Sequence, residues 1–437
     1  MTLAEVKLWG TLIGAVSMPD NTQVAGFQYA PDFLSSGIEV SPLVMPLRVA
    51  PYTFPSLSAE SFRGLPGLLA DSLPDRYGNA LIDAWLAGHG RAPESFDAVE
   101  RLCYIGRRGM GALEFAPALG PSPSPRRDLQ VAELVELASE VLSRREELVA
   151  SLAEGQQEQA MLDILSVGAS AGGARAKAVI AWNPATDEVR SGQLDELSPG
   201  FEHWLLKFDG VAGNRDKDVL ADPQGYGAIE YAYSLMARDA GIAMSDCRLL
   251  EENGRRHFMT RRFDRTGDGS KRHMQSLGAL AHFDFNQPGA HSYEQAFLAS
   301  RRLGLSIPSI EQLFRRMAFN IVARNQDDHV KNIAFLMGRS GAWELAPAFD
   351  MTYAYRPSSA WTDKHQMTLN GKRGAFTLAD FRAGAQAVPL PRGAATRIVR
   401  EVAEVVSQWE VYAGRARVDD EHIRRIAASL RLSFPRD

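Results

Sequence analysis

A segment in the C-terminal half carries the residue types and the spacing that phosphoryl transfer requires. In RNQDDHVKNIAFLMGRSGAWELAPAFD, Asn332 follows Asp327 by five positions, and Asp350 comes after two strand-like runs. Metal ions and a lysine neutralise charge in this reaction, while an aspartate orients the acceptor hydroxyl. A loop, a short hairpin and a second carboxylate would bring three oxygen-bearing side chains to one magnesium ion. An aspartate and an asparagine at this spacing are also common in solvated turns and helix caps.

The neighbouring loop residues have supporting roles in this interpretation. Asp328 lies four positions before Asn332, so Asp327 is the better candidate for the base. His329 and Lys331 are assigned to loop support or to phosphate contact. The nine histidines include no H-E-x-x-H pair of the kind that indicates a zinc site.

Three upstream segments could complete a nucleotide site. Small residues in SAGGARAK, residues 170–177, would let backbone N–H groups approach a phosphate, although an ordinary hairpin turn has the same composition. Lys207 follows two leucines in HWLLKFDG, where a kinase places its phosphate-binding lysine and where a strand-end lysine also reaches solvent. In MTRRFDR, Phe263 could pack on adenine while the backbone of Arg261 and Phe263 bonds the edge of the base. A core phenylalanine beside a solvated Arg/Asp cluster fits equally well.

The elements that must position these residues form a β-containing half followed by a mainly helical half. Apolar residues at three- and four-residue steps predict helices over 76–86, 129–142 and 229–240. A proline-rich connector at 116–127 marks the first domain boundary. Several strands are expected over 6–51, further strands over 176–182, 203–210, 247–252 and 256–263, and mainly helical structure from 292 to the C-terminus.

Composition limits the class of protein. The 437 residues are 45% hydrophobic and 23% charged, which allows a substantial core without disulfide or metal crosslinks. A net charge of -5 argues against a protein whose main role is coating nucleic acid. Cys103 and Cys247 have no C-x-x-C spacing, which excludes a disulfide framework and a cysteine zinc site. Because the sequence has no apolar window of membrane-spanning length and no signal-peptide pattern, we expect a cytoplasmic protein without membrane contact.

Taken in order, these motifs resemble those of the HipA family of serine/threonine toxin kinases over nearly the whole chain. The resemblance rests on LPGLLADSLPDRYG and GALEFAP, then on S-x-G-G-A-R-x-K, the strand lysine, R-F-D-R, D-D-H-x-K-N and the closing F-D. It implies an α+β, two-lobed protein-kinase-like fold with a small β-rich N-terminal domain and an all-helical C-terminal lobe. The expected limits are 1–120 for the N-terminal domain, 128–265 for the kinase N-lobe and 266–437 for the C-lobe.

The resemblance also implies roles for individual residues. Asp327 would be the catalytic base, Asn332 and Asp350 the Mg²⁺ ligands, and Ser170 an autophosphorylation site. A phosphate on Ser170, with about -1.5 to -2 charge, would repel the phosphates of ATP. Arg261 and the Gly-Gly-Ala-Arg of the loop depart from the best-known family member. The ATP site would comprise Gly172, Gly173, Ala174, Arg175, Ala176, Lys177, Lys207, Arg261, Arg262, Phe263, His329, Val330, Lys331, Asn332 and Asp350.

The activity implied is that of an ATP- and Mg²⁺-dependent kinase, the toxin of a toxin-antitoxin module. Its partners would be a HipB-like helix-turn-helix antitoxin, operator DNA mainly through that antitoxin, and a substrate in the translation machinery, glutamyl-tRNA synthetase in the best-known member. Phosphorylation would starve translation and favour persistence. The alternative is a catalytically silent, nucleotide-binding corepressor, and the complete set of ligands favours the enzyme. Direct nucleic-acid binding ranks lowest, because no recognition helix accompanies the arginines at 255, 256, 261, 262 and 265.

Overall fold

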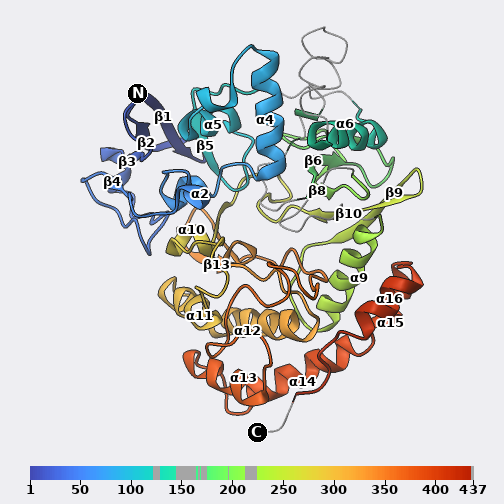
Figure 1. Ribbon diagram of the computed structural model, residues 1–437. Helices are drawn as coiled ribbons and strands as arrows, with labels where there is room; N and C mark the ends of the chain where they lie inside the picture. Colours follow the sequence, from blue (N-terminus) through green and yellow to red (C-terminus); the bar gives the residue numbers. More distant parts are fainter. Residues whose placement is uncertain are drawn as a thin grey trace.

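The computed structural model describes residues 1–121, 128–143, 164–165, 168, 175–194, 196–211 and 224–434 (Figure 1). Within these residues the chain forms three sheets with helices around them, an α+β arrangement. Half of the predicted proline-rich connector, residues 122–127, lies outside the described residues. So do Ser170, Gly172, Gly173 and Ala174 of the predicted phosphate-binding loop.

The N-terminal part is built on a five-stranded antiparallel sheet with the strand order β4-β3-β2-β1-β5. Ala4 and Val6 of β1 are buried while the residues between and beside them are more exposed, because alternate side chains of a strand face opposite sides. Asp75 caps helix α4 by accepting a hydrogen bond from Gly78 N at 2.7 Å. The predicted β-rich part and the helix expected over 76–86 are confirmed. The elements are β1 (Thr2–Leu8), β2 (Thr11–Met18), β3 (Gly26–Tyr29), α1 (Pro31–Leu34), β4 (Tyr52–Thr53), α2 (Ala59–Phe62), α3 (Gly67–Ala70), α4 (Arg76–Gly88), η1 (Pro93–Ser95), α5 (Ala98–Ile105) and β5 (Leu113–Ala116).

A second five-stranded antiparallel sheet, in the order β7-β6-β8-β10-β9, contains the predicted lysine strand. Strands β6 and β8 pair with Lys177 opposite Lys207, so the end of the glycine-rich segment lies beside the strand lysine. All of β6 is buried, and Ala178, Ile180 and Trp182 on one of its faces share a core with α6, whereas Val179 packs in a separate cluster on the other face. The predicted helices over 129–142 and 229–240 are confirmed. The elements are α6 (Val131–Ser143), β6 (Lys177–Trp182), β7 (Val189–Ser191), β8 (Glu202–Lys207), α9 (Tyr226–Asp239), β9 (Cys247–Glu252) and β10 (Arg255–Arg261).

A third, three-stranded sheet lies in the C-terminal half, so the expectation of an all-helical C-terminal lobe is wrong. All four residues of β12 are buried, and this apolar run is too short for a helix and pairs on both sides. The sheet also determines where the chemistry-bearing residues lie. The loop from Asp327 to Asn332 enters β12, and Asp350 follows β13. The strands are β11 (His273–Ser276), β12 (Ala334–Met337) and β13 (Trp343–Leu345).

The rest of the C-terminal half is helical, as the pattern from residue 292 onward predicts. Figure 1 shows these helices in the lower half of the molecule, beneath the first two sheets. They share a core that includes Phe314, Phe319 and Trp409, all at most 1% exposed. The helices are α10 (Leu277–Ala281), α11 (Tyr293–Arg302), α12 (Ile307–Val322), η2 (Val330–Asn332), α13 (Leu378–Gly384), η3 (Ala385–Ala387), α14 (Ala394–Val406), α15 (Trp409–Arg415) and α16 (Asp420–Ala427).

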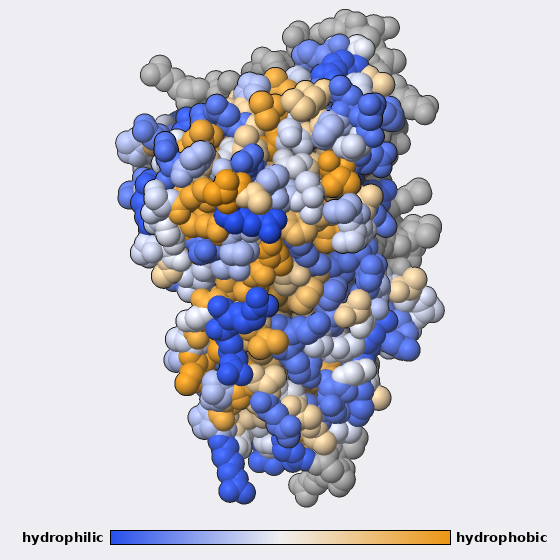
Figure 2. All heavy atoms as spheres, turned by 90° about the vertical axis from the view of Figure 1, so that its left-hand side faces the viewer, coloured by the Kyte–Doolittle hydropathy of each residue, from blue (hydrophilic) through white to orange (hydrophobic). Residues whose placement is uncertain are grey.

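The face shown in Figure 2 is mixed in character, and both cysteines are buried. Hydrophobic side chains stand in small groups among hydrophilic ones on the face that Figure 2 shows. Cys103 and Cys247 are both buried free thiols, as the absence of a disulfide framework predicts. Within the part of the chain that the structure describes, a helix with both the length and the apolar character needed to cross a bilayer is not found.

Candidate active site

Lys207 stands at the centre of the site. It is the last residue of β8, and its Nζ donates a hydrogen bond to Glu230 Oε1 at 2.5 Å and another to Asp350 Oδ1. Glu230 lies on α9 and its side chain is 2% exposed, whereas the Asp350 side chain is 24% exposed. One lysine therefore joins the second sheet, helix α9 and the segment that follows the third sheet.

The two carboxylates determine the charge state of this group. Burial is the largest influence on Lys207 and acts to lower its pKa, but Asp350 and Glu230 together raise the pKa well above the usual value of lysine. Burial acts to raise the pKa of Asp350, and the cations of Lys207 and Lys177 outweigh it, so this pKa is lowered. Near neutral pH, Lys207 is therefore a cation and Asp350 an anion. These are the charge states needed to contact a phosphate and a metal ion.

Asp350 is held in an uncommon backbone conformation. Its φ of +52° lies in the left-handed region, which costs a residue with a side chain roughly 1–2 kcal/mol. Asn325, which is 3% exposed, donates from Nδ2 to Asp350 O at 3.1 Å and to Asn320 Oδ1 at 3.0 Å. These bonds hold the sharp turn that brings the carboxylate of Asp350 to Lys207.

A pocket opens between the second sheet and the segments around residues 329–332 and 349–351. The rings of Phe263 and Phe349 lie 5.7 Å apart on its wall and offer an apolar surface to a flat base. Of the residues predicted for the ATP site, Val330 is 1% exposed and belongs to the core, so it does not line this pocket. Those that do line it are Lys207, Arg261, Arg262, Phe263, His329, Lys331, Asn332 and Asp350.

The predicted adenine-binding segment is fixed by its own backbone. The N–H of Arg261 donates to Asp246 O at 2.8 Å, and the N–H of Arg262 donates to His203 O at 2.9 Å. Both donors are therefore already engaged. The N–H of Arg261 is thus already used, whereas the ring of Phe263 lines the pocket, and the backbone contact of Phe263 with a base stays a prediction.

Asp264 ties the same segment to the N-terminal part. It accepts hydrogen bonds from Arg262 at 2.9 and 2.7 Å, from Arg265 at 2.7 Å and from Gly111 N at 2.7 Å. Burial acts to raise the pKa of Asp264, but the two guanidinium groups outweigh it and the pKa is lowered. The Arg262 side chain is thus a buried ion-pair partner, and R-F-D-R links the adenine-binding segment to the loop at residues 109–111.

Asp327 faces a second cleft that adjoins the pocket. The wall that the two share contains His329, Lys331 and Asp350, and the opposite wall of the cleft comes from the N-terminal part between residues 60 and 83. A phosphate donor in the pocket and an acceptor in the cleft would therefore meet at this shared wall. The two cavities therefore adjoin at these side chains.

Two side chains hold Asp327 at that place. Asn332 donates from Nδ2 to Asp327 O at 2.8 Å, and Trp361 donates from Nε1 to Asp327 Oδ1 at 2.5 Å. His329 Nε2 lies 3.8 Å from the same carboxylate oxygen. The structure therefore brings the predicted base and both predicted metal ligands to neighbouring walls of the two cavities.

Asp328 has a different environment from its neighbour. It is 2% exposed and accepts hydrogen bonds from Tyr293 Oη at 2.7 Å, His365 Nδ1 at 2.8 Å and Gln366 N at 2.8 Å. Burial acts to raise the pKa of Asp328, and His365 with these hydrogen bonds lowers it below the usual value. Asp328 therefore anchors the loop, which agrees with the choice of Asp327 as the base.

The donor set fits magnesium that binds together with a nucleotide. Asp350 and Asn332 supply hard oxygen donors at one pocket, and Mg²⁺ usually takes one or two protein ligands with phosphates and waters. Because Nδ2 of Asn332 donates to Asp327 O, the side-chain oxygen of Asn332 points away from that carbonyl group. Among the residues described, no group of three or more His, Cys, Asp or Glu side chains is placed so that it could hold a metal ion.

The described end of the predicted phosphate-binding loop is packed tightly. Arg175 lies over the Tyr226 ring at 4.3 Å, and Ala176 is fully buried. Lys177 is 1% exposed and its Nζ lies 2.8 Å from Asp75 Oδ2, whose side chain is 6% exposed. Lys177 lines neither cavity and instead forms a buried ion pair with the N-terminal part.

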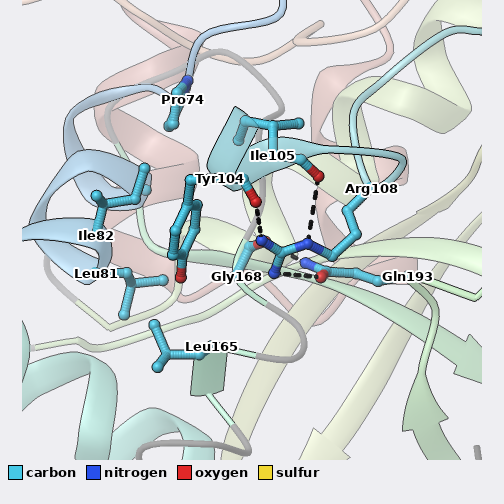
Figure 3. A pocket seen from close by; sticks show the side chains of 10 residues that line it. Pro74, Leu81, Ile82, Tyr104, Ile105, Arg108, Leu165, Gly168 and Gln193 are labelled. Atoms are coloured by element: carbon cyan, nitrogen blue, oxygen red, sulfur yellow. Dashed lines mark hydrogen bonds between the residues drawn. The ribbon is translucent and has the colours of Figure 1, made fainter. Parts of the chain in front are cut away.

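The segment before this loop is also held by the N-terminal part (Figure 3). Gln193 donates from Nε2 to Gly168 O, and Arg108 donates to Gln193 Oε1 at 3.3 Å and to Ile105 O at 3.3 Å. Burial lowers the pKa of Arg108. Gly168 and Lys177 flank the loop, so contacts to helix α5 and to the start of α4 fix both of its flanks.

Sequence reasoning missed three residues of this site. The sequence contains a signal for Glu230, because it is a single acid on the apolar face of α9. Its pairing with Lys207 joins two different elements, α9 and β8, which a local pattern does not reveal. Asp75 stands in the quoted LPDRYG phrase, while its partner lies about a hundred residues later. Trp361 lies in an irregular segment to which no periodic pattern applies, so no local signal points to it.

Comparison with known proteins identifies similar chains. The family model described as HipA-like C-terminal domain matches residues 169–409, and the model described as HipA N-terminal domain matches residues 4–116. Among solved structures, HipA of Shewanella oneidensis MR-1, in a complex described as a toxin-antitoxin system with HipB and its operator DNA, is 16% identical. It covers 98% of this chain and 94% of its own at a TM-score of 0.67, so the two share a fold.

Two other comparisons add nothing to that likeness. The Helicobacter pylori proinflammatory kinase CtkA is 12% identical and covers 56% of this chain and 92% of its own, at a TM-score of 0.32, which does not establish a common fold. No curated protein matches the chain significantly.

Proposed function

Because this chain belongs to the HipA family, we propose that it is an ATP- and Mg²⁺-dependent serine/threonine protein kinase that acts as the toxin of a toxin-antitoxin module. The observation that carries the proposal is the contact of Lys207 with both Glu230 and Asp350 on the wall of a pocket that also contains Asn332. A lysine cation held by two carboxyl groups, beside an apolar surface that could bind a base, suits a nucleoside triphosphate. The domain limits of 1–120, 128–265 and 266–437 are part of this proposal.

In the proposed reaction the pocket binds ATP and the cleft binds the acceptor. Phe263 would contact adenine, and Lys207 would hold the α- and β-phosphates. Asp350 and Asn332 would hold Mg²⁺, which when bound neutralises charge on the phosphate oxygens. The positions of the predicted base and of Lys207 on adjoining cavities would hold the two reactants close and in line.

Asp327 would accept the proton of a serine or threonine hydroxyl. The acceptor oxygen forms a bond to the γ-phosphorus as the bond from that phosphorus to the bridging oxygen breaks, and ADP leaves with that oxygen. The proton of the hydroxyl passes to the Asp327 carboxylate. The buried network around Asp328 would keep this loop fixed during transfer.

Transfer of labelled phosphate tests the proposal. Purified protein with Mg²⁺ and γ-labelled ATP should label itself or an added acceptor protein, and mass spectrometry should find phosphate on Ser170. Asp327→Gln should abolish the transfer while binding of a fluorescent ATP analogue and the circular-dichroism spectrum stay unchanged. Equal labelling by the variant would refute the assignment of the base, and absence of both binding and transfer in the wild type would refute the proposed function.

The substrate and the partners are proposed from the family. The Shewanella oneidensis HipA structure is a complex with HipB and operator DNA, which supports a HipB-like helix-turn-helix antitoxin that brings this chain to DNA. We propose a component of the translation machinery, such as glutamyl-tRNA synthetase, as the phosphorylated protein. Phosphoproteomics of cells that produce the wild type or the Asp327→Gln variant would identify the substrate.

A further inference from the structure

We infer that Trp361 is a positioning residue for phosphoryl transfer, which it serves by fixing the carboxylate of the catalytic aspartate. This inference rests on the proposed function, because it takes Asp327 as the base. Trp361 Nε1 donates to Asp327 Oδ1 at 2.5 Å, and Trp361 lies on the wall of the cleft in which the acceptor would bind. No residue of the segment 355–364 is among those that the sequence predicts for the site.

The indole is itself held in place. The N–H of Trp361 donates to Ser359 Oγ at 3.0 Å, and Gln366 donates from Nε2 to Trp361 O. The residue as a whole is 8% exposed, and its ring lies 6.4 Å from that of His329. Both backbone groups of Trp361 are hydrogen-bonded and its ring is packed. The indole N–H is therefore a donor with a fixed position.

Segment 359–366 holds the catalytic loop at two successive residues. Trp361 bonds Asp327, and Gln366 bonds both Trp361 and Asp328, its N–H donating to Asp328 Oδ1 at 2.8 Å. The loop residue that faces the cleft and the one that faces the core are therefore tied to the same short segment. The position of the base relative to the acceptor depends on this connection.

The chemical consequence concerns the orientation of the carboxylate. An aspartate carboxylate turns readily about its terminal torsion, which has a broad energy profile. A charge-assisted N–H bond to one oxygen removes that freedom and determines where the second oxygen points. Misplacement of a catalytic group by about 1 Å can cost about a hundred-fold in rate. Loss of the indole donor should therefore slow transfer and leave nucleotide binding intact, because Trp361 does not line the ATP pocket.

The test compares the indole donor with a matched tryptophan elsewhere. Trp361→Phe keeps an aromatic ring and removes the donor, while Trp361→His restores a ring N–H. Trp343→Phe is the control, since the Nε1 of Trp343 also donates to an oxygen, Glu39 O at 3.2 Å, away from the site. Ser359→Ala removes the hydrogen bond that holds the backbone of Trp361 and leaves the indole itself unchanged. This variant is a second test of the inference if Trp361→Phe misfolds.

Each variant is assayed for the single-turnover rate of autophosphorylation and of casein labelling, for the Kd of a fluorescent ATP analogue, and for the thermal midpoint. We expect Trp361→Phe to lower the rate about ten-fold or more while its Kd stays within two-fold of the wild-type value. Trp361→His should recover most of the rate, and the rate of Ser359→Ala should lie between those of Trp361→Phe and the wild type. Trp343→Phe should match the wild type. A rate for Trp361→Phe equal to or above the wild type would overturn the inference, as would an equal loss in Trp343→Phe. Asp327→Asn, run in parallel, separates the failures. If this variant transfers phosphate as well as the wild type, Asp327 is not the base and the inference about Trp361 fails with that assignment. If the wild type neither binds the ATP analogue nor transfers phosphate, the proposed function itself is wrong.

Discussion

Neutralising Asp75 should destabilise the contact between the N-terminal part and the second sheet. Asp75 Oδ2 lies 2.8 Å from Lys177 Nζ, and the two side chains are 6% and 1% exposed. Asp75→Asn removes the carboxylate that lies nearest the Lys177 ammonium in a buried pair, and breaking such a pair by changing one member typically costs about 3–5 kcal/mol. Asparagine is as good an N-cap as aspartate, so the cap of α4 survives this exchange.

Two further variants separate the charge from the cap. Asp75→Ala also loses the bond from Gly78 N, which should add about 1 kcal/mol. Combining Asp75→Asn with Lys177→Met should recover most of the loss, because replacing both members of a buried pair is often nearly neutral. The double-mutant cycle therefore isolates the pair from other effects of either exchange.

Urea unfolding followed by circular dichroism measures these free energies. Glu5→Gln is the control, since the Lys7–Glu5 pair at 3.1 Å has side chains 34% and 54% exposed and such pairs contribute about 0–1 kcal/mol. The reasoning is refuted if Asp75→Asn unfolds at the same urea concentration as Glu5→Gln, or if the double variant is no more stable than Asp75→Asn alone.

Three other perturbations test separate parts of the molecule. Lys207→Met should lower kcat/KM for ATP by about a hundred-fold or more in a labelling assay, because it removes the cation that Asp350 and Glu230 hold; Lys7→Met should have no effect. Asp264→Asn leaves the buried guanidinium groups of Arg262 and Arg265 without their carboxylate and should lower the unfolding free energy by about 3–5 kcal/mol, so an unchanged thermal midpoint would contradict this role. The pKa of His203, His273 and His282 is about 4 in the folded protein because of burial, below the usual value of about 6.5. Between these two pKa values the unfolded chain therefore binds more protons than the folded protein. The free energy of unfolding should be greatest above about pH 6.5 and fall as the pH drops toward 4. His273→Gln should make the urea midpoint depend less on pH over this range.

Local patterns predicted the elements and the residues that one short segment brings together. Asp327, Asn332 and Asp350 lie within one unit of loop and hairpin, so their spacing already encodes their proximity. Helices α4, α6 and α9 follow from the apolar periodicity of their segments.

Pairings between distant elements could not be predicted from such patterns. Glu230 meets Lys207 only because α9 packs beside β10, and Asp75 meets Lys177 across two parts of the chain. The all-helical expectation came from the family resemblance, and β12 and β13 contradict it at the two strand-like runs that the sequence pattern places before Asp350. Their pairing with β11 joins distant segments and was not predicted. Arg262 is a similar case, since the choice between a ligand contact and a buried pair with Asp264 depends on the loop at residues 109–111.

A crystal structure with Mg²⁺ and a non-hydrolysable ATP analogue tests the central claim most directly. We expect the adenine against Phe263, the phosphates at Lys207, the metal on Asp350 and Asn332, and the γ-phosphate directed toward Asp327. A nucleotide bound elsewhere, or one whose γ-phosphate points away from the cleft that Asp327 and Trp361 line, would contradict it.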